Sequence, residues 1–389
     1  MAIPRYATVA AWPLLSAGFR PFFLCAGVWA CFAMGLWIPL LAGVLTLPSL
    51  FDPVAWHFHE MVFGFVVAAI AGFLLTAIPN WTGRLPLQGW PLAGLVLLWF
   101  LGRICVAFSG TISGWGSMVG DLAFLLVFLA VVGREIIAGR NWRNLPVLAA
   151  LGLLIAANAM SHAGVLGHAM WGEAGQRLAV SVVLMLISLI GGRIIPSFTA
   201  NWLRKKGAEN MPTPPDRFDT TVLAVSAMTL TAWVIFDLST VIGVLLLFTA
   251  LAHGLRLARW RGAVTRSEPL LWILHIGYAW LPLGLILLGG SAWAPHLTTS
   301  ALHALTVGAM GTMILAVMTR ASLGHTGAAL TADRCTLVAY LLVLVAAAAR
   351  LLAPFMPEHY TTALYVAACS WIAAFALFTL HYLPRYLRT

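Results

Sequence analysis

The chain consists of long apolar runs separated by short polar breaks. A transmembrane helix needs about 20 predominantly apolar residues. Lipid offers no partner for free backbone groups, and the runs lack the short apolar–polar alternation of barrel strands. The pattern therefore predicts an all-α polytopic membrane protein, a single membrane domain over 1–389 with about 12 spans. The runs fall at about 18–46, 54–78, 91–109, 115–138, 145–165, 174–197, 218–236, 239–258, 269–290, 298–319, 333–352 and 360–383.

The polar breaks alternate in charge along the chain. Acidic Asp52, Glu173, Asp237 and Glu358 lie in one set of breaks. The other set of breaks carries most of the basic residues. Because positively charged loops stay in the cytoplasm, we predict that this set is cytoplasmic and that both termini lie on the same side. The longest polar stretch, about 201–217, is predicted to be a cytoplasmic hinge loop. The basic residues of this face are Arg5, Arg84, Arg134, Arg140, Arg143, Arg204, Lys205, Lys206, Arg217, Arg256, Arg259, Arg261, Arg266, Arg334, Arg385 and Arg388.

Composition agrees with this pattern and excludes several classes of protein. The chain is 61% hydrophobic and only 9% charged, whereas about a quarter of the residues in soluble domains are charged. The net charge of +10 is spread over small groups, which does not indicate nucleic-acid binding. Five scattered cysteines without a Cys-x-x-Cys spacing give no support for a disulfide framework, a zinc knuckle or a covalently attached haem. We expect no removable signal peptide at the N-terminus.

An internal repeat relates two distant spans. Within the stretch 57–84, residues 59–83 align without a gap on 303–327 at an offset of 244 residues. A weaker pattern adds the sixth span, where Pro196 to Thr199 repeats the Pro-x-x-Thr of Pro79 to Thr82. Spans two, six and ten would then be equivalent, which indicates three four-helix units. The matched pairs of the first alignment include His59 with His303, Gly64 with Gly308, Thr82 with Thr326 and Gly83 with Gly327.

The eleven histidines fall into two layers. An ionisable residue inside a membrane needs a partner and is by default a candidate for a functional site. The outer layer contains most of the candidates, and the inner layer is smaller. The outer histidines are His57, His59, His162, His168, His296, His303 and His359, and the inner ones are His253, His275, His325 and His381.

The strongest candidates are His59 and His303, which open spans two and ten. Each lies roughly five residues, or about 8 Å, inside the outer end of its helix. Two imidazoles at equal depth between helices are what axial ligation of a haem iron requires, and they also suit copper. The alternative is that each caps a helix or binds water.

Other outer histidines could bind a second metal. His162 and His168 are six residues apart across a helix end, and imidazole suits copper. His57 is a further candidate ligand, but in a regular helix His57 and Glu60 share a face that points away from His59. An ordinary interfacial or structural role is the alternative for these residues.

The inner face offers a second, weaker set of candidates. His275 could be a cofactor ligand or a hydrogen-bonded core residue, and His325 lies in a turn. Arg193 and Arg320 near this face could pair with haem propionates, bind lipid headgroups or snorkel. Arg103 lies in the middle of span three without an evident acidic partner, so it must face a protected interior.

Six blocks of the sequence form a recognisable pattern. They are AGFRPFF (17–23), WHFHEMVFGF (56–65), NWTGR (80–84), GGRIIPSFTAN (191–201), LHIGYAWLPLG (274–284) and HALTVGAMGTMILAVMTRASLGHTG (303–327). These blocks resemble the NnrS family of bacterial membrane proteins, and the resemblance extends over nearly the whole chain. One departure is Ala328, where family members commonly continue His325-Thr326-Gly327 with a basic residue.

This resemblance implies a multi-pass protein of the bacterial inner membrane that carries haem and copper. It further implies a role in the nitric-oxide response of denitrifying bacteria and in protection against nitrosative stress. The ligand would be nitric oxide or a related nitrosyl species. Since the chain has no attachment motif, the haem should be non-covalent and b-type. Whether the protein is a nitric-oxide-directed oxidoreductase stays open.

The layout also resembles subunit I of the haem–copper oxidases in span number, internal termini and haem-binding histidines on spans two and ten. Those enzymes place ligands of the second metal on spans six and seven, where this chain has no histidine. A transporter, or a copper-binding protein without turnover, is the rival interpretation. The sequence contains neither a nucleophile with a paired base nor a phosphate-binding loop. We therefore do not expect hydrolase or kinase chemistry.

Overall fold

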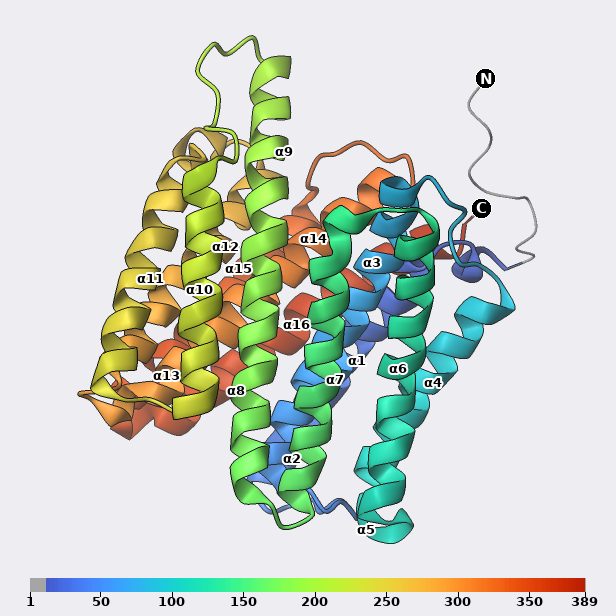
Figure 1. Ribbon diagram of the computed structural model, residues 1–389, viewed down its shortest axis with the longest axis vertical. Helices are drawn as coiled ribbons and strands as arrows, with labels where there is room; N and C mark the ends of the chain where they lie inside the picture. Colours follow the sequence, from blue (N-terminus) through green and yellow to red (C-terminus); the bar gives the residue numbers. More distant parts are fainter. Residues whose placement is uncertain (1–11, 389) are drawn as a thin grey trace. The chain divides into compact units, whose positions relative to one another are not determined.

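The structure is a computed structural model that describes residues 12–388 (Figure 1). Within these residues all regular elements are helical, and twelve helices are long and apolar enough to cross a membrane. The predicted all-α polytopic fold is therefore confirmed. Arg5, one of the basic residues used for the predicted orientation, lies outside the described residues.

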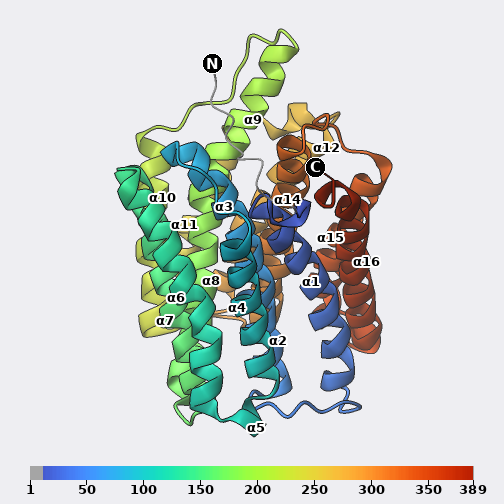
Figure 2. The same cartoon turned by 90° about the vertical axis from the view of Figure 1, so that its right-hand side faces the viewer.

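The chain divides into two compact units, and α8 and α16 each continue from one unit into the other. Unit 1 comprises 1–179 and 378–389. In this unit α4 packs on α6, α6 packs on α7, and α1 packs on α3 (Figure 2). The elements are η1 (Pro13–Leu15), α1 (Phe19–Leu41), α2 (Pro53–His59), η2 (Glu60–Val66), α3 (Val67–Thr82), α4 (Trp90–Ala107), α5 (Ser109–Ile112), α6 (Gly114–Ala138), η3 (Trp142–Asn144), α7 (Leu145–Val165) and α8 (Ala169–Leu186).

Unit 2 comprises 180–377. Here α12 contacts both α11 and α14, and α10 packs on α11 (Figure 1). The elements are η4 (Ile187–Gly191), α9 (Gly192–Lys205), α10 (Arg217–Phe236), α11 (Thr240–Ala258), η5 (Gly262–Thr265), α12 (Pro269–Gly290), η6 (Pro295–Leu297), α13 (Thr298–His303), η7 (Ala304–Gly311), α14 (Thr312–His325), α15 (Arg334–Leu352), η8 (Ala353–Phe355), η9 (Pro357–His359) and α16 (Tyr360–Tyr386).

Local signals explain where helices begin and end. Asp52 caps α2 by accepting hydrogen bonds from the next two free backbone N–H groups, and Pro53 follows at the first helical position. Asp216 and Asp219 form a reciprocal capping box at the start of α10. The helix α9 continues to Lys205, five residues into the predicted hinge loop 201–217. Basic residues in its last turn complement the helix dipole.

Three segments of π-helix occur between residues 12 and 388, one in each of spans two, six and ten. The segments η2 and η7 begin directly after His59 and His303, which are the residues matched by the 244-residue offset. Gly83 and Gly327, also matched, both take a left-handed conformation, with φ of 71° and 70°. Local geometry therefore supports the repeat between spans two and ten. Short π-helical segments are frequent at functional sites.

Candidate functional site

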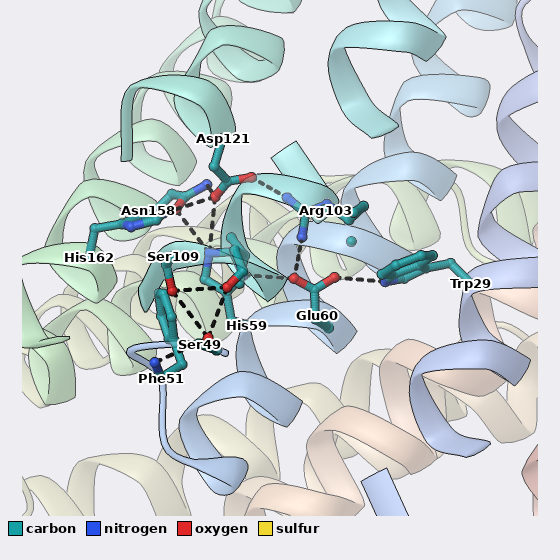
Figure 3. Close-up of polar contacts among 12 residues, drawn as sticks. Trp29, Ser49, Phe51, His59, Glu60, Arg103, Ser109, Asp121, Asn158 and His162 are labelled. Atoms are coloured by element: carbon teal, nitrogen blue, oxygen red, sulfur yellow. Dashed lines mark hydrogen bonds and ion pairs between the residues drawn. The ribbon is translucent and has the colours of Figure 1, made fainter. Parts of the chain in front are cut away.

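Six polar side chains meet in the apolar interior of unit 1, and we call them the His59 cluster (Figure 3). All are at most 4% exposed. They come from five elements, α2, η2, α4, α6 and α7, which belong to the consecutive spans two to five. Buried polar groups at this density need mutual partners, because lipid and apolar side chains supply none. The members are His59, Glu60, Arg103, Asp121, Asn158 and His162.

One oxygen of Asp121 is the focus of the cluster. Its Oδ2 lies 3.0 Å from Nε2 of His59 and 3.1 Å from Nε2 of His162. Asn158 donates to the same oxygen through Nδ2 at 2.9 Å, and its Oδ1 lies 3.2 Å from Nε2 of His59. Figure 3 shows these three side chains pointing toward the Asp121 carboxylate.

Arg103 lies between the two carboxylates of the cluster. Its Nη2 donates to Oδ1 of Asp121, and its Nη1 donates to Oε1 of Glu60 at 2.9 Å. The other oxygen of Glu60 accepts a hydrogen bond from the indole Nε1 of Trp29 at 2.8 Å. Oε1 of Glu60 also lies 3.4 Å from Nδ1 of His59. Arg103 is thus a bridge that fixes both acidic groups.

Two glycines make room for these contacts. A Cβ atom on Gly102 would lie 2.7 Å from Oδ1 of Asp121, and one on Gly64 would lie 2.4 Å from Nε1 of Trp29. The absence of a side chain at both positions lets the carboxylate and the indole approach the helix backbones closely. Neither requirement is visible in the hydropathy pattern, where both glycines pass as ordinary residues of a membrane helix.

Phe51 covers the cluster on one side. Its ring lies 5.0 Å from the His59 ring and 5.3 Å from the His162 ring, between ring centroids. The segment before α2 is held in place by Ser49, which donates to the backbone O of Val106 at 2.8 Å, and by the N–H of residue 50, which donates to Ser109. The two imidazoles are therefore enclosed by protein.

The formal charges of the cluster do not cancel. Among the described residues that form it, Glu60 and Asp121 carry two negative charges and Arg103 carries one positive charge. With neutral imidazoles one negative charge is left over in an apolar interior, where an unbalanced charge is costly. Either an extra proton on an imidazole or a bound cation would balance it.

The residues fit a transition-metal ion. His59, Asp121 and His162 each offer one ligand atom, and these atoms all lie within 4.8 Å of one another. Two imidazoles and one carboxylate are a common donor set for iron, copper and zinc.

One further contact is typical of a metal site. Metal-bound histidines usually donate their second ring N–H to a carboxylate or carbonyl, and Nδ1 of His59 faces Glu60 in this way. Nδ1 of His162 is buried and has no hydrogen-bond partner among the described residues, so it lacks such a contact.

The structure places the predicted outer ligands in different surroundings. His59 and His162 come together at Asp121. His57 instead stacks on Trp37, with ring centroids 4.4 Å apart, and His168 is exposed at the start of α8. His57 and His168 therefore do not join the His59 cluster, and a metal role for either stays a prediction.

His303 belongs to unit 2, and its ring is oriented by its own helix. Nδ1 lies 2.8 Å from the backbone O of Thr299, so it carries the proton that this hydrogen bond needs. Nε2 is left as the free acceptor nitrogen, an arrangement typical of histidines that bind a metal or haem iron. The joint ligation of one cofactor by His59 and His303 stays a prediction.

Two of the inner candidates contact neighbouring residues of α9. Nε2 of His275 lies 3.0 Å from Oγ1 of Thr199. Arg320 lies over the ring of Phe198, 4.1 Å from its centroid, which is a cation–π contact rather than an ion pair. His325 and Arg193 are exposed. Cofactor binding by these four residues stays a prediction.

Two sequence-based expectations need correction. Arg103 has acidic partners on two helices, although none was evident from the sequence. Glu60 contacts His59 rather than pointing away from it, because the chain changes from α-helix to π-helix at Glu60 and the regular helical spacing no longer applies. Asp121 and Asn158 were not predicted, yet an aspartate within an apolar run meets the same criterion that singled out the histidines.

A second buried polar cluster lies in unit 2, and we call it the Arg256 cluster. Nε of Arg256 donates to Oδ1 of Asp219 at 2.7 Å, and its Nη1 donates to the Tyr278 hydroxyl at 3.0 Å and to Ser188 O at 2.9 Å. Nδ1 of His253 lies 2.9 Å from the same hydroxyl. The members are Ser188, Asp219, His253, Arg256 and Tyr278.

Comparison with known proteins identifies the family. No curated protein and no solved structure matches the chain. The family model described as NnrS protein matches residues 13–389. This match spans every helix described above and both buried clusters, and the chain therefore belongs to the NnrS family.

Proposed function

We propose that this protein is a metal-containing protein of the bacterial inner membrane that binds nitric oxide or a related nitrosyl species in the response to nitrosative stress. The observation that carries the proposal is the convergence of two imidazoles on one carboxylate oxygen in a buried cluster that has two carboxylates and one arginine. Membership of the NnrS family supports the nitric-oxide role.

The chain's own residues would form two separate sites, one for a copper ion and one for a haem iron. His59, Asp121 and His162 would hold a copper ion, with Glu60 orienting His59 and Arg103 holding both carboxylates in place. His303, with Nδ1 occupied by Thr299, would present Nε2 to a haem iron. Such metal centres supply an electron-rich or Lewis-acidic atom to which nitric oxide can bind.

The test is the metal content of the purified full-length protein. His59→Gln and His162→Gln remove a ligand nitrogen but keep a side chain that can hydrogen-bond. We expect each to lower the copper content per chain by about tenfold or more, measured by elemental mass spectrometry. His296→Gln and His359→Gln are the matched controls, because these exposed histidines belong to unit 2 and lie outside the His59 cluster, and they should keep the wild-type copper content.

Haem is tested separately by absorption spectroscopy. His303→Gln should remove or shift the Soret band while the copper content stays unchanged, and added nitric oxide should shift the band of the wild type. Wild-type copper content in both His59→Gln and His162→Gln would refute the copper assignment. A purified protein without a Soret band would refute the haem assignment.

A further inference from the structure

A pocket opens at the predicted cytoplasmic end of unit 1, apart from the His59 cluster. Its volume is about 490 Å³, and it lies between the end of α3, the loop 83–88 and the end of α6. The floor is apolar, with Leu75, Ile78 and Val132 all at most 4% exposed. Pockets of this volume hold small organic ligands.

The rim of the pocket is charged and carries an excess positive charge. Nε of Arg84 lies 2.5 Å from Oε2 of Glu135, and Nε of Arg134 lies 2.9 Å from Oε1 of the same residue. Two guanidinium groups thus share one carboxylate. The Glu135 side chain is only 13% exposed, whereas those of Arg84 and Arg134 are 44% and 65% exposed. Both arginines line the pocket, and each guanidinium group has more N–H donors than its contacts with Glu135 occupy among the described residues.

The backbone around the pocket is held in place by specific contacts. Gly83 ends α3 with φ of 71°, a conformation that glycine adopts without strain, and the chain turns so that Arg84 joins the rim. At the end of the loop, Gln88 donates to the backbone O of Ser16 at 2.5 Å. Near the end of α3, the backbone O of Trp81 accepts a hydrogen bond from the side chain of Asn141 at 2.5 Å. The pocket is therefore formed before any ligand binds.

The rim arginine distinguishes this helix end from its repeat. Thr82 and Gly83 match Thr326 and Gly327, and both glycines have the same left-handed conformation. The residue that follows is Arg84 in the first copy, but it is the uncharged Ala328 in the second. The charged rim thus belongs to the first copy of the repeat and is not a general property of these helix ends.

We propose that this pocket binds a phosphate ester with an apolar body. The free donors of Arg84 and Arg134 would hold the phosphate oxygens, since guanidinium groups match oxyanions in geometry and charge. The apolar floor would take the attached hydrocarbon. The rim lies within about one helical turn of the ends of two spans, where lipid phosphates reside, so an acidic phospholipid and a soluble alkyl phosphate are the two sources of this chemistry.

The test is ligand binding to the detergent-purified full-length protein, followed by native mass spectrometry. The probes are dihexanoyl phosphatidylglycerol, the zwitterionic dihexanoyl phosphatidylcholine and hexyl phosphate. Arg84→Gln and Arg134→Gln should each weaken binding of phosphatidylglycerol by about tenfold. Glu135→Gln should tighten it, because both arginines lose their competing carboxylate. Arg143→Gln is the control, since Arg143 lies at the same end of the unit but does not line the pocket.

The outcomes separate the sources and can overturn the proposal. Binding of phosphatidylglycerol alone assigns a lipid, whereas equal binding of hexyl phosphate assigns a soluble ester. Wild-type affinity in both Arg84→Gln and Arg134→Gln would refute the site, and so would equal affinity for the zwitterionic lipid. A thermal unfolding midpoint equal to that of the wild type verifies that each variant is folded.

Discussion

The His59 cluster and the Arg256 cluster have the same basic parts. Each buries an arginine–aspartate pair, at least one histidine and groups from a π-helical segment, η2 in unit 1 and η4 in unit 2. Their charges differ. Asp219 also lies 3.5 Å from Arg259, which in turn pairs with Asp216, so the two acids and the two arginines of this group balance.

Their histidines differ as well. Both ring nitrogens of His253 have hydroxyl partners, Tyr278 on one side and Ser226 on the other, each at 2.9 Å. His59 and His162 instead converge on one carboxylate oxygen. The comparison teaches that a buried arginine–aspartate pair does not define a metal site. Two imidazoles on one carboxylate oxygen, and two carboxylates beside a single arginine, distinguish the His59 cluster as the candidate for chemistry.

The largest expected effect comes from removing the arginine of each cluster. Arg103→Met leaves Glu60 and Asp121 buried without a cation, which should cost about 3–5 kcal/mol of unfolding free energy. Arg256→Met leaves Asp219 with Arg259 as a partner, so we expect about 1–3 kcal/mol. Denaturant unfolding in mixed micelles measures both values. Adding Glu60→Gln to Arg103→Met should recover part of the loss, and equal costs for the two arginines would contradict the charge difference.

An intermediate loss of stability is expected when alanine replaces the glycines that the charged side chains approach closely. A Cβ on Gly192 would lie 2.1 Å from Nη2 of Arg256, and one on Gly102 would lie 2.7 Å from Oδ1 of Asp121. Gly192→Ala and Gly102→Ala should each cost about 1–3 kcal/mol by overpacking, measured by the same unfolding assay. Only Gly102→Ala should also lower the copper content.

Two other glycines provide controls for this comparison. Gly94 and Gly152 lie inside α4 and α7, and a Cβ atom at either would meet nothing within 4 Å. Alanine at these positions should leave stability unchanged or raise it by about 0.5–1 kcal/mol. A similar loss of stability at all four positions would show that the close approaches at Gly192 and Gly102 do not cause the loss.

The smallest expected effect lies at the exposed edge of the Arg256 cluster. Hydrogen bonding to Arg259 lowers the pKa of Asp216 to about 2. A carboxyl with a lowered folded-state pKa stabilises the protein above its unfolded pKa, and this stabilisation is lost as the pH falls through about 2. Asp216→Asn keeps a capping side chain but removes the charge, so it should lower the melting midpoint slightly at pH 7.

The difference between Asp216→Asn and the wild type should then shrink as the melting assay is moved from pH 5 toward acid. A difference that stays constant over this range would show that the ion pair does not contribute. Because the pair is exposed to solvent, its contribution should also fall as salt is added.

Much of the fold was predictable because it depends on local information. A run of apolar residues must form a helix in lipid whatever surrounds it, and the sequence predicted about twelve spans where the described residues contain twelve helices long and apolar enough to cross a membrane. The repeat of spans two and ten was visible for a similar reason, since residues matched along the chain, such as Gly83 and Gly327, adopt matched backbone conformations. Family membership also rests on blocks that are linear in sequence.

The site was predictable only in part, because it depends on how helices are rotated against one another. The sequence singled out His59, His162 and Arg103 as ionisable residues in apolar runs, and it equally contained Asp121. It could not say that these side chains share one point, since hydropathy does not determine which face of a span meets which neighbour. The π-helix at Glu60 changes that rotation within a single span. Tertiary packing therefore decided which charges meet, and with them the arrangement of two imidazoles and one carboxylate that makes the His59 cluster a candidate metal site.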